Sequence, residues 1–364
     1  MPTENSFIGQ SIEDLDTPSL LLDWQACERN IKLLAEFFAD KPCKLRPHFK
    51  NNKCTTLARK QQAAGQTVGF TCAKVGEAEV LAEHRFEDVL IANQVVGAAK
   101  IARLVEVAKR CRLGVAVDHA DNIAALSQAM SGAGVTLGVL VEVDIGMGRC
   151  GVTPGERALE LARIVEQSPG LEFRGLQAFE GHLIYINDFE TRSRETRDCI
   201  MKAVEAKHLI EGSGLACPTI SGGSSATYMV TGVIDGVTEL QAGTYPTMDW
   251  RYHEVVPEFE IALSVLARVI SRRPDEAVLD VGVKGAGGEF GIPKIKGHDE
   301  IDIPFFASEE HLLIRQAPDW SIGEAVQLVS SHACTTCNLY REMFVHEDGK
   351  VVDVWPIEAA GRLS

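Results

Sequence analysis

The sequence lacks an excess of positive charge and any long apolar run. Its 364 residues include 36 Lys and Arg against 51 Asp and Glu, a net charge of −15. Binding of nucleic-acid phosphates requires a basic surface, so we expect no nucleic-acid partner. No apolar run reaches the length that crosses a membrane, so we expect no membrane partner either.

The sequence also lacks the features of a secreted protein. Residues Met1–Ser6 contain no basic region followed by an apolar run, so we expect no signal peptide. The ten cysteines are scattered, without the regular spacing of a small disulfide-bonded domain. These two absences together predict free thiols and a cytoplasmic location. Low-complexity segments and short repeats are absent as well.

A regular alternation of short apolar strands and amphipathic helices fills residues 25–250. The predicted strands are Lys44–Phe49, Thr67–Cys72, Asp88–Asn93, Leu113–Asp118, Val135–Asp144, Gly175–Phe179, Thr219–Gly222 and Glu239–Gly243. The predicted helices are Trp24–Phe38, Cys54–Ala64, Val75–His84, Lys100–Cys111, Asn122–Met130, Arg157–Gln167 and Thr191–Glu211. This order predicts a parallel (β/α)8 TIM barrel. A doubly wound open sheet is the alternative, because periodicity does not reveal whether a sheet closes.

The alternation ends near Pro257, after which short strands follow one another without long helices. They are predicted at Glu258–Val269, Ala277–Val283, Leu312–Arg315, Ala325–Ser331 and in two runs around the hairpin signal Asp348-Gly349. We therefore expect two domains. The barrel would span residues 25–250, and a mostly β C-terminal domain would combine residues 251–364 with residues 1–24.

A lysine follows the first predicted barrel strand. Barrel enzymes place their chemistry at the carboxyl ends of the strands, so Lys50 could serve as a Schiff-base lysine. A lysine in this place can equally be an ordinary solvated side chain.

Two turns rich in glycine and hydroxyl groups follow the seventh and eighth predicted strands. They are Ser221–Ser225 and Gln241–Tyr245. Glycine lets backbone N–H groups approach a phosphate group, and hydroxyl groups add further donors. A phosphate site is one interpretation of the pair, and ordinary loop glycines are the other.

Polar residues also follow the fifth and sixth predicted strands. Arg149 lies in the glycine-rich stretch Asp144–Gly151 and could donate two hydrogen bonds to an anionic oxygen, unless it pairs with Asp144. His182 follows the sixth strand and would bring an imidazole to the same rim, although a lone histidine is more often structural.

His332 and Cys334 lie two residues apart on a predicted strand of the second domain. Side chains at this spacing share one face, so both could bind one metal ion. Two ligands are too few for a closed structural zinc site and would leave positions for water and substrate. A buried cysteine beside a hydrogen-bonded histidine is the other interpretation. Cys337 completes a Cys-x-x-Cys pattern with Cys334, so it could have a redox role or be a third metal ligand. The zinc-binding pattern of nucleobase deaminases, a His-x-Glu paired with a Pro-Cys-x-x-Cys, is absent.

Several motifs occur here in an order that resembles one enzyme family. They are Arg-Pro-His-Phe-Lys-Asn-Asn-Lys, Asp-Ile-Gly-Met-Gly-Arg-Cys-Gly, Gly-Gly-Ser-Ser, Gln-Ala-Gly-Thr-Tyr-Pro-Thr-Met-Asp, Ser-Glu-Glu-His and His-Ala-Cys-Thr-Thr-Cys-Asn. Together they resemble the D-serine dehydratase and D-threonine aldolase family. These are fold-type III pyridoxal-phosphate enzymes, related in architecture to alanine racemase. The resemblance runs from about Leu15 to the stretch Trp355–Glu358.

The resemblance implies a homodimer, with pyridoxal 5'-phosphate bound to Lys50 and not to Lys53. By motif position, the phosphate-binding residues would be Gly222, Gly223, Ser224, Ser225 and Tyr245, and Arg149 would contact the cofactor ring region or a carboxylate. His332 and Cys334 would hold a divalent metal ion, either Zn, Mn or Mg. Imidazole and thiolate suit Zn²⁺ better than Mg²⁺, which prefers oxygen ligands.

Two positions depart from the family pattern. Asn51-Asn52 stands where many relatives have Thr-His or Met-His, and Phe179 stands where many have Tyr. The first departure removes an imidazole beside the lysine, and the second removes a hydroxyl group. Substrate preference and the partner of the cofactor ring nitrogen therefore stay open.

The resemblance implies a D-configured 3-hydroxy amino acid as substrate. Dehydration to a 2-keto acid and ammonia is the first interpretation, because the dehydratases carry His-x-Cys where the aldolases tend to have His-x-Asp. Lys50 would then remove the Cα proton. The alternative is retro-aldol cleavage to glycine and an aldehyde, with His182 or His48 as the base. Racemisation of an amino acid is a third catalytic option, but the metal pair would then have no role. A non-catalytic pyridoxal-phosphate carrier is the rival from another class of protein, but such carriers lack a second domain.

Overall fold

We describe the fold from a computed structural model, which covers residues 6–298 and 300–364. Residues Met1–Asn5, on which the expectation of no signal peptide partly rests, lie outside the described residues. Within the described residues, no helix combines the length and apolar character that crossing a membrane would require. The cytoplasmic location stays a prediction.

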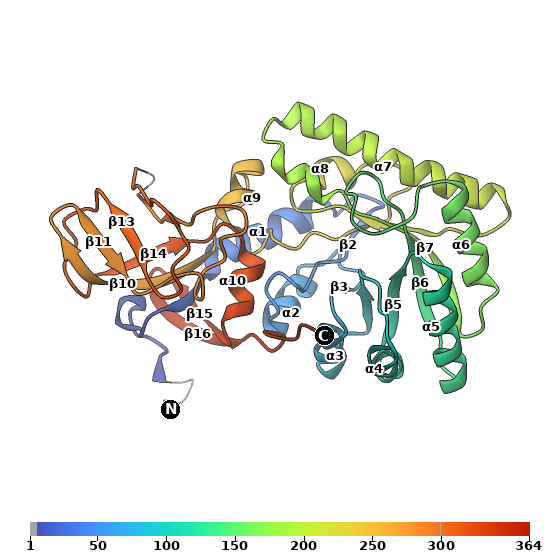
Figure 1. The fold of residues 1–364 in the computed structure, drawn as a ribbon, viewed down its shortest axis with the longest axis horizontal. Helices are drawn as coiled ribbons and strands as arrows, with labels where there is room; N and C mark the ends of the chain where they lie inside the picture. Colours follow the sequence, from blue (N-terminus) through green and yellow to red (C-terminus); the bar gives the residue numbers. More distant parts are fainter. Residues whose placement is uncertain (1–5, 299) are drawn as a thin grey trace. The chain divides into compact units, whose positions relative to one another are not determined.

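The chain forms two compact units, each with its own sheet (Figure 1). The barrel unit comprises Ala35–Lys50, Lys60–Gly243 and Arg362–Ser364. The β unit comprises the described residues up to Leu34 together with Asn51–Arg59 and Thr244–Gly361. Lys50 is thus the last residue of one barrel segment, and Asn51 belongs to the β unit.

The barrel unit contains eight parallel strands in the order β2-β9-β8-β7-β6-β5-β4-β3. Their bounds are β2 Lys44–Leu45, β3 Phe70–Cys72, β4 Asp88–Ile91, β5 Arg112–Val117, β6 Leu137–Glu142, β7 Leu171–Ala178, β8 Thr219–Gly222 and β9 Glu239–Leu240. The two outermost strands also meet, because parallel bridges join Leu45 to Thr67 and His48 to Thr71. The predicted barrel is confirmed, and these bridges are incompatible with an open sheet.

The first barrel strand is shorter than predicted. Regular pairing covers only Lys44–Leu45 and not the expected Lys44–Phe49. Pro47 has no N–H group and cannot donate to the ladder. On either side of Pro47, the N–H groups of Arg46 and His48 still donate to the carbonyls of Leu240 and Ala242, at 2.8 and 3.0 Å. Lys50 therefore lies in the turn that follows, at the carboxyl end of the strand.

Helices alternate with these strands along the chain. They are α1 Trp24–Phe37, α2 Thr55–Ala63, α3 Val75–Glu83, α4 Ala98–Ala108, α5 Ala120–Ala133, α6 Glu156–Glu166, α7 Phe189–Gly212 and the short α8 Tyr228–Thr231. The predicted helices agree with these bounds to within a few residues, and α8 was not predicted. Figure 1 shows α5 and α6 along the outer side of β6 and β7. The apolar face of α6 is buried there, as the sequence pattern requires.

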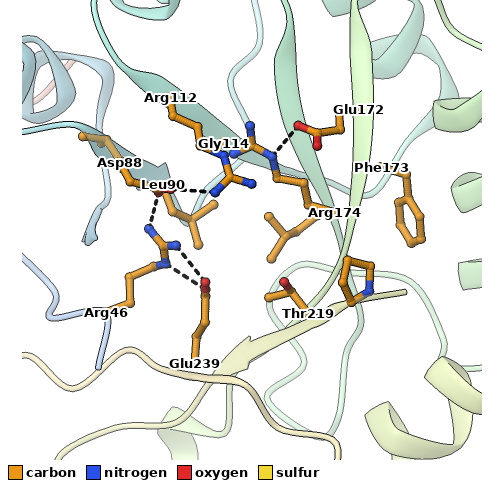
Figure 2. Close-up of a pocket in the computed structure, with 13 residues that line it drawn as sticks. Arg46, Asp88, Leu90, Arg112, Gly114, Glu172, Phe173, Arg174, Thr219 and Glu239 are labelled. Atoms are coloured by element: carbon orange, nitrogen blue, oxygen red, sulfur yellow. Dashed lines mark hydrogen bonds and ion pairs between the residues drawn. The ribbon is translucent and has the colours of Figure 1, made fainter. Parts of the chain in front are cut away.

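Ion pairs surround a pocket of about 180 Å³ at the amino end of the barrel (Figure 2). Arg46 pairs with Glu239 at 2.7 Å and with Asp88 at 2.6 Å. Arg112 donates to the same Asp88 at 3.2 Å, and Arg174 donates to Glu172 at 2.7 Å. Each arginine thus has a carboxylate partner. This end of a barrel usually serves stability, so we assign the cluster a structural role.

The β unit is built on a mostly antiparallel sheet with the order β12-β14-β10-β1-β15-β16, and β11 pairs with β10 and β13. The bounds are β1 Ser19–Asp23, β10 Leu263–Arg273, β11 Glu276–Leu279, β12 Lys294–Ile295, β13 Leu312–Arg315, β14 Ala325–Val329, β15 Glu342–Glu347 and β16 Lys350–Pro356. The helices α9 Trp250–Val255 and α10 Ala333–Leu339 complete the unit. The strand β1, from before the barrel, lies between β10 and β15. The mostly β second domain is therefore confirmed.

A buried histidine in β15 makes the stability of the protein sensitive to acid. Neither ring nitrogen of His346 has a hydrogen-bond partner in the part of the chain that the structure describes. Burial lowers the pKa of His346. In the unfolded chain this side chain titrates near its ordinary value of about 6.5, so the unfolded state takes up a proton first as the pH falls. We expect the free energy of unfolding to decrease between pH 7 and pH 5.

The test is urea unfolding of the protein and of a His346→Leu variant at pH 7 and pH 5. The variant has no proton to take up at this position, so its stability should fall less on acidification. An identical fall in both proteins would contradict the assignment.

Candidate active site

A second pocket of about 180 Å³ lies in the barrel unit and is lined by residues that follow the strands. Its lining includes His48, Lys50, Arg149, Gln177, Phe179 and Gln241. The sequence singled out Lys50, His48 and Arg149, and the structure brings these three together. Their strands are far apart in the chain, so barrel closure creates the pocket.

Phe179 carries the aromatic surface of this pocket. Its ring centroid lies 5.9 Å from the Nζ atom of Lys50 and 5.5 Å from the Cζ atom of Arg149. Cations at this distance are attracted to the face of an aromatic ring. Phe179 offers a ring without a hydroxyl group, so the hydrogen-bonding groups of the pocket come from neighbouring polar side chains such as Gln177 and Gln241.

A buried carboxyl group near Arg149 escaped the sequence analysis. Glu142 ends β6 and accepts a hydrogen bond from Gln94 at 2.6 Å. Burial raises the pKa of Glu142, although the charge of Arg149 acts in the opposite direction. A signal was available, because Glu142 is the polar end of an otherwise apolar strand at the edge where barrels place their chemistry.

The turn after β8 differs from a simple phosphate cradle. A Cβ atom at Gly222 would lie 1.8 Å from the carbonyl oxygen of Ala178, so only glycine fits there. The N–H group of Gly223 donates to Glu180 at 3.2 Å, and that of Ser224 donates to Thr227 at 3.0 Å. Two of the amides that the sequence assigned to phosphate are therefore used within the protein. The phosphate site at Gly222–Ser225 stays a prediction.

Two further predicted residues are not among those that line the Lys50 pocket. His182 lies on the short 3-10 helix Gly181–Tyr185, and its Nε2 atom is 3.9 Å from the Sγ atom of Cys199. Tyr245 belongs to the β unit, where its ring centroid lies 6.2 Å from that of Phe259. Their roles as base and phosphate ligand remain predictions.

In the β unit, His332 and Cys334 lie at the start of a helix and not on a strand. β14 ends at Val329, His332 is the N-cap residue of α10, and Cys334 is in its first turn. The predicted strand placement is wrong. The cause is a distant side chain, because the carboxylate of Asp249 accepts the N–H group of Ala333 at 3.0 Å. A carboxylate in this position stabilises the amino end of a helix.

Asp249 also orients the histidine. Its Oδ2 atom lies 2.9 Å from the Nδ1 atom of His332, and the imidazole also interacts with Cys334. Burial acts to lower the pKa of His332, but the negative charge at Cys334 and hydrogen bonding to Asp249 raise it overall. The sequence analysis missed Asp249, although it ends the quoted Thr-Met-Asp motif.

Cys334 is contacted by the residue that follows Lys50 in the chain. The amide group of Asn51 lies 3.6 Å from the Sγ atom of Cys334, and its oxygen accepts the hydroxyl group of Thr247 at 2.9 Å. Asn51 therefore brings a hydrogen-bond donor to the thiol. An N–H donor to sulfur stabilises the thiolate form that binds metals.

Cys337 lies three residues after Cys334 on the same helix, and side chains at this spacing are neighbours on the helix surface. It is nevertheless a poor metal ligand. The side chain is completely buried, and burial raises the pKa of its thiol. A neutral buried thiol packs as a small apolar group.

The described residues contain no group of three or more His, Cys, Asp and Glu arranged around one metal position. An imidazole held by Asp249 and a thiol held by Asn51 fit a two-ligand site completed by water and substrate. The barrel pocket, with a lysine, a guanidinium group and an aromatic ring, fits pyridoxal phosphate.

Comparison with known proteins agrees with this chemistry. Residues 22–249 match the family described as alanine racemase, N-terminal domain, and residues 262–346 match a putative serine dehydratase domain. The chain is 38% identical to a D-threonine aldolase from Arthrobacter sp, over 97% of this chain and 95% of the relative. A D-threo-3-hydroxyaspartate dehydratase from Delftia sp. is 28% identical, over 88% and 92% of the two chains.

A solved structure is similar over its whole length. The D-threonine aldolase from Filomicrobium marinum superimposes with a TM-score of 0.95 and 36% identity, covering 98% of this chain and 99% of that one. The predicted fold and the predicted lyase class are thus confirmed, and the family depends on pyridoxal phosphate. The chain belongs to the D-serine dehydratase and D-threonine aldolase family of fold-type III pyridoxal-phosphate enzymes.

Proposed function

We propose that this protein is a lyase that cleaves D-3-hydroxy amino acids, D-threonine above all, to glycine and an aldehyde. The observation that carries the proposal is the higher similarity to D-threonine aldolases, at 36% and 38% identity, than to the dehydratase, at 28%. The presence of Cys334 pointed to dehydration first. The whole-chain similarity outweighs this single position, so dehydration becomes the second candidate.

The barrel residues would bind the cofactor and position the substrate. Pyridoxal phosphate supplies an electron sink when bound. Lys50 would hold it covalently, and Phe179 would pack against it. Arg149 offers a forked pair of donors for a carboxylate. His48 lines the same pocket as Lys50 and is the better placed base for the substrate hydroxyl proton, with His182 as the alternative.

His332 and Cys334 would hold a divalent metal ion, Zn, Mn or Mg. Such an ion would supply a Lewis acid for the substrate hydroxyl group. Asp249 would keep the imidazole of His332 in the tautomer that binds metal, and Asn51 would donate to the sulfur of Cys334. Imidazole and thiolate favour zinc among the three ions.

The homodimer and the small-molecule substrate complete the proposal. Both are what the resemblance to the family implies. Sedimentation or light scattering of the purified protein tests the dimer, for which a mass near twice 39.6 kDa is expected.

A product assay tests the reaction itself. The protein, loaded with pyridoxal phosphate and a divalent metal, is incubated with D-threonine, D-serine and D-3-hydroxyaspartate. We expect glycine and acetaldehyde from D-threonine, with no more than traces of 2-oxobutanoate and ammonia. A 2-keto acid and ammonia as the main products from any of the three would instead establish a dehydratase. The L-enantiomers serve as controls and should not react.

A further inference from the structure

A carboxyl group that the proposed chemistry does not use lies against the turn that follows β8. Glu180 is 0% exposed. One of its oxygens accepts the hydroxyl groups of Thr227 and Thr231, each at 2.7 Å, and the other accepts the N–H group of Gly223 at 3.2 Å. All three donors belong to this turn or to the helix α8 that follows it. Glu180 therefore contacts the predicted phosphate-binding turn from the side of the protein interior.

Thr227 holds the same turn at a second point. Its oxygen accepts the N–H group of Ser224 at 3.0 Å, while its own hydroxyl hydrogen is donated to Glu180. Gly223 has a φ of 76°, and a Cβ atom there would lie 2.3 Å from the side chain of Leu240. The conformation of the turn is thus determined by Glu180 and Thr227 without help from a ligand.

Glu180 has no ion-pair partner among the residues that the structure describes. Its hydrogen-bond partners are two hydroxyl groups and one amide. Burial raises the pKa of Glu180, against the opposing effect of these hydrogen bonds.

We propose that Glu180 is a positioning residue that, together with Thr227, shapes Gly222–Ser225 into the seat for the cofactor phosphate group. The inference rests on the proposed cofactor site and adds to it a residue that does not touch the cofactor. Glu180 acts through the amide of Gly223 and the hydroxyl group of Thr227. Its effect is therefore on phosphate recognition and not on the bond to Lys50.

The test compares two ligands that differ only in the phosphate group. Cofactor-free protein is titrated with pyridoxal phosphate and with pyridoxal, and binding is followed by absorbance. The Glu180→Gln variant keeps the size of the side chain but has one acceptor oxygen in place of two, so it must lose either the hydrogen bond from Gly223 or those from Thr227 and Thr231. We expect its Kd for pyridoxal phosphate to rise at least about tenfold, or ~1.4 kcal/mol. The Kd for pyridoxal should change less than about twofold.

Two further variants make the result specific. Glu239→Gln also exchanges a carboxyl group for an amide in the same barrel, but at the amino end, where the partly buried Glu239 pairs with Arg46. It should leave both Kd values unchanged. Thr227→Val removes the acceptor for Ser224 and one donor to Glu180, and should reproduce the phosphate-selective loss even if Glu180→Gln fails to fold.

The proposal is overturned if the folded variants at Glu180 and Thr227 lose affinity for both ligands equally, or for neither. A wild-type protein that binds pyridoxal phosphate no better than pyridoxal would instead refute the phosphate site at this turn. The two failures are therefore distinguishable.

Discussion

Replacing Lys50 by alanine is expected to abolish the covalent link to the cofactor and to lower kcat/KM by roughly 10³-fold or more. Lys50 is the lysine at the carboxyl end of the first barrel strand, in a pocket with Arg149 and Phe179. The visible absorbance band of the purified protein should disappear in the variant after dialysis. Borohydride reduction followed by peptide mass mapping of the wild type should place the modified lysine at position 50.

Lys53 provides the control for this experiment. It is buried and has a φ of 55°, a left-handed conformation that asparagine tolerates better than alanine does. A Lys53→Asn variant should keep the absorbance band and the borohydride-trapped lysine. If reduction modifies Lys53 in the wild type, the assignment of Lys50 is wrong.

Loss of the metal pair is the second large expected effect. His332→Ala and Cys334→Ala should each lower turnover of D-threonine by about 10²- to 10³-fold while the cofactor absorbance is retained. The reason is that each variant would remove one of the two proposed protein ligands, while the pocket proposed for the cofactor is lined by other residues. Treatment with a chelator should have the same effect as the variants, and added Zn²⁺ or Mn²⁺ should restore wild-type activity only.

Cys337→Ala is the matched control for this experiment. Cys337 is a buried neutral thiol on the same helix, so its loss should cost stability but little metal affinity. Inductively coupled plasma analysis of bound metal in all three variants separates loss of metal from misfolding. Full activity of the metal-free protein on every D-3-hydroxy amino acid would refute the metal-assisted reaction, and racemisation would then become the leading alternative.

The barrel could be predicted from the sequence because its cause is local. Short apolar runs such as Asp88–Ile91 and Leu137–Glu142 are strands buried on both faces, and amphipathic helices lie between them. The alternation alone indicates parallel strands joined by helices. Lys50 and the glycine-rich turns were found for the same reason, since their positions are defined relative to strand ends.

Sequence reasoning failed where the cause lies far away in the chain. His332 and Cys334 are at a helix start because Asp249, 84 residues before Ala333, accepts the first helical N–H group. The sequence also did not reveal that Glu180, 43 residues before Gly223, and Thr227 accept the N–H groups of Gly223 and Ser224 in the predicted phosphate-binding turn. A hydrogen bond between distant residues leaves no periodic signal in the sequence.

The sequence by itself therefore determined the kind of fold, the position of the lysine proposed to bind the cofactor and the type of residues in the proposed metal pair. Hydrophobic periodicity and residue chemistry are properties of the chain, and both are readable without coordinates. Only the tertiary structure decided how Glu142, Glu180 and Asp249 are used, because a buried carboxyl group acquires its hydrogen-bond partners only after distant segments enclose it. The same burial raises the pKa of Glu142 and Glu180.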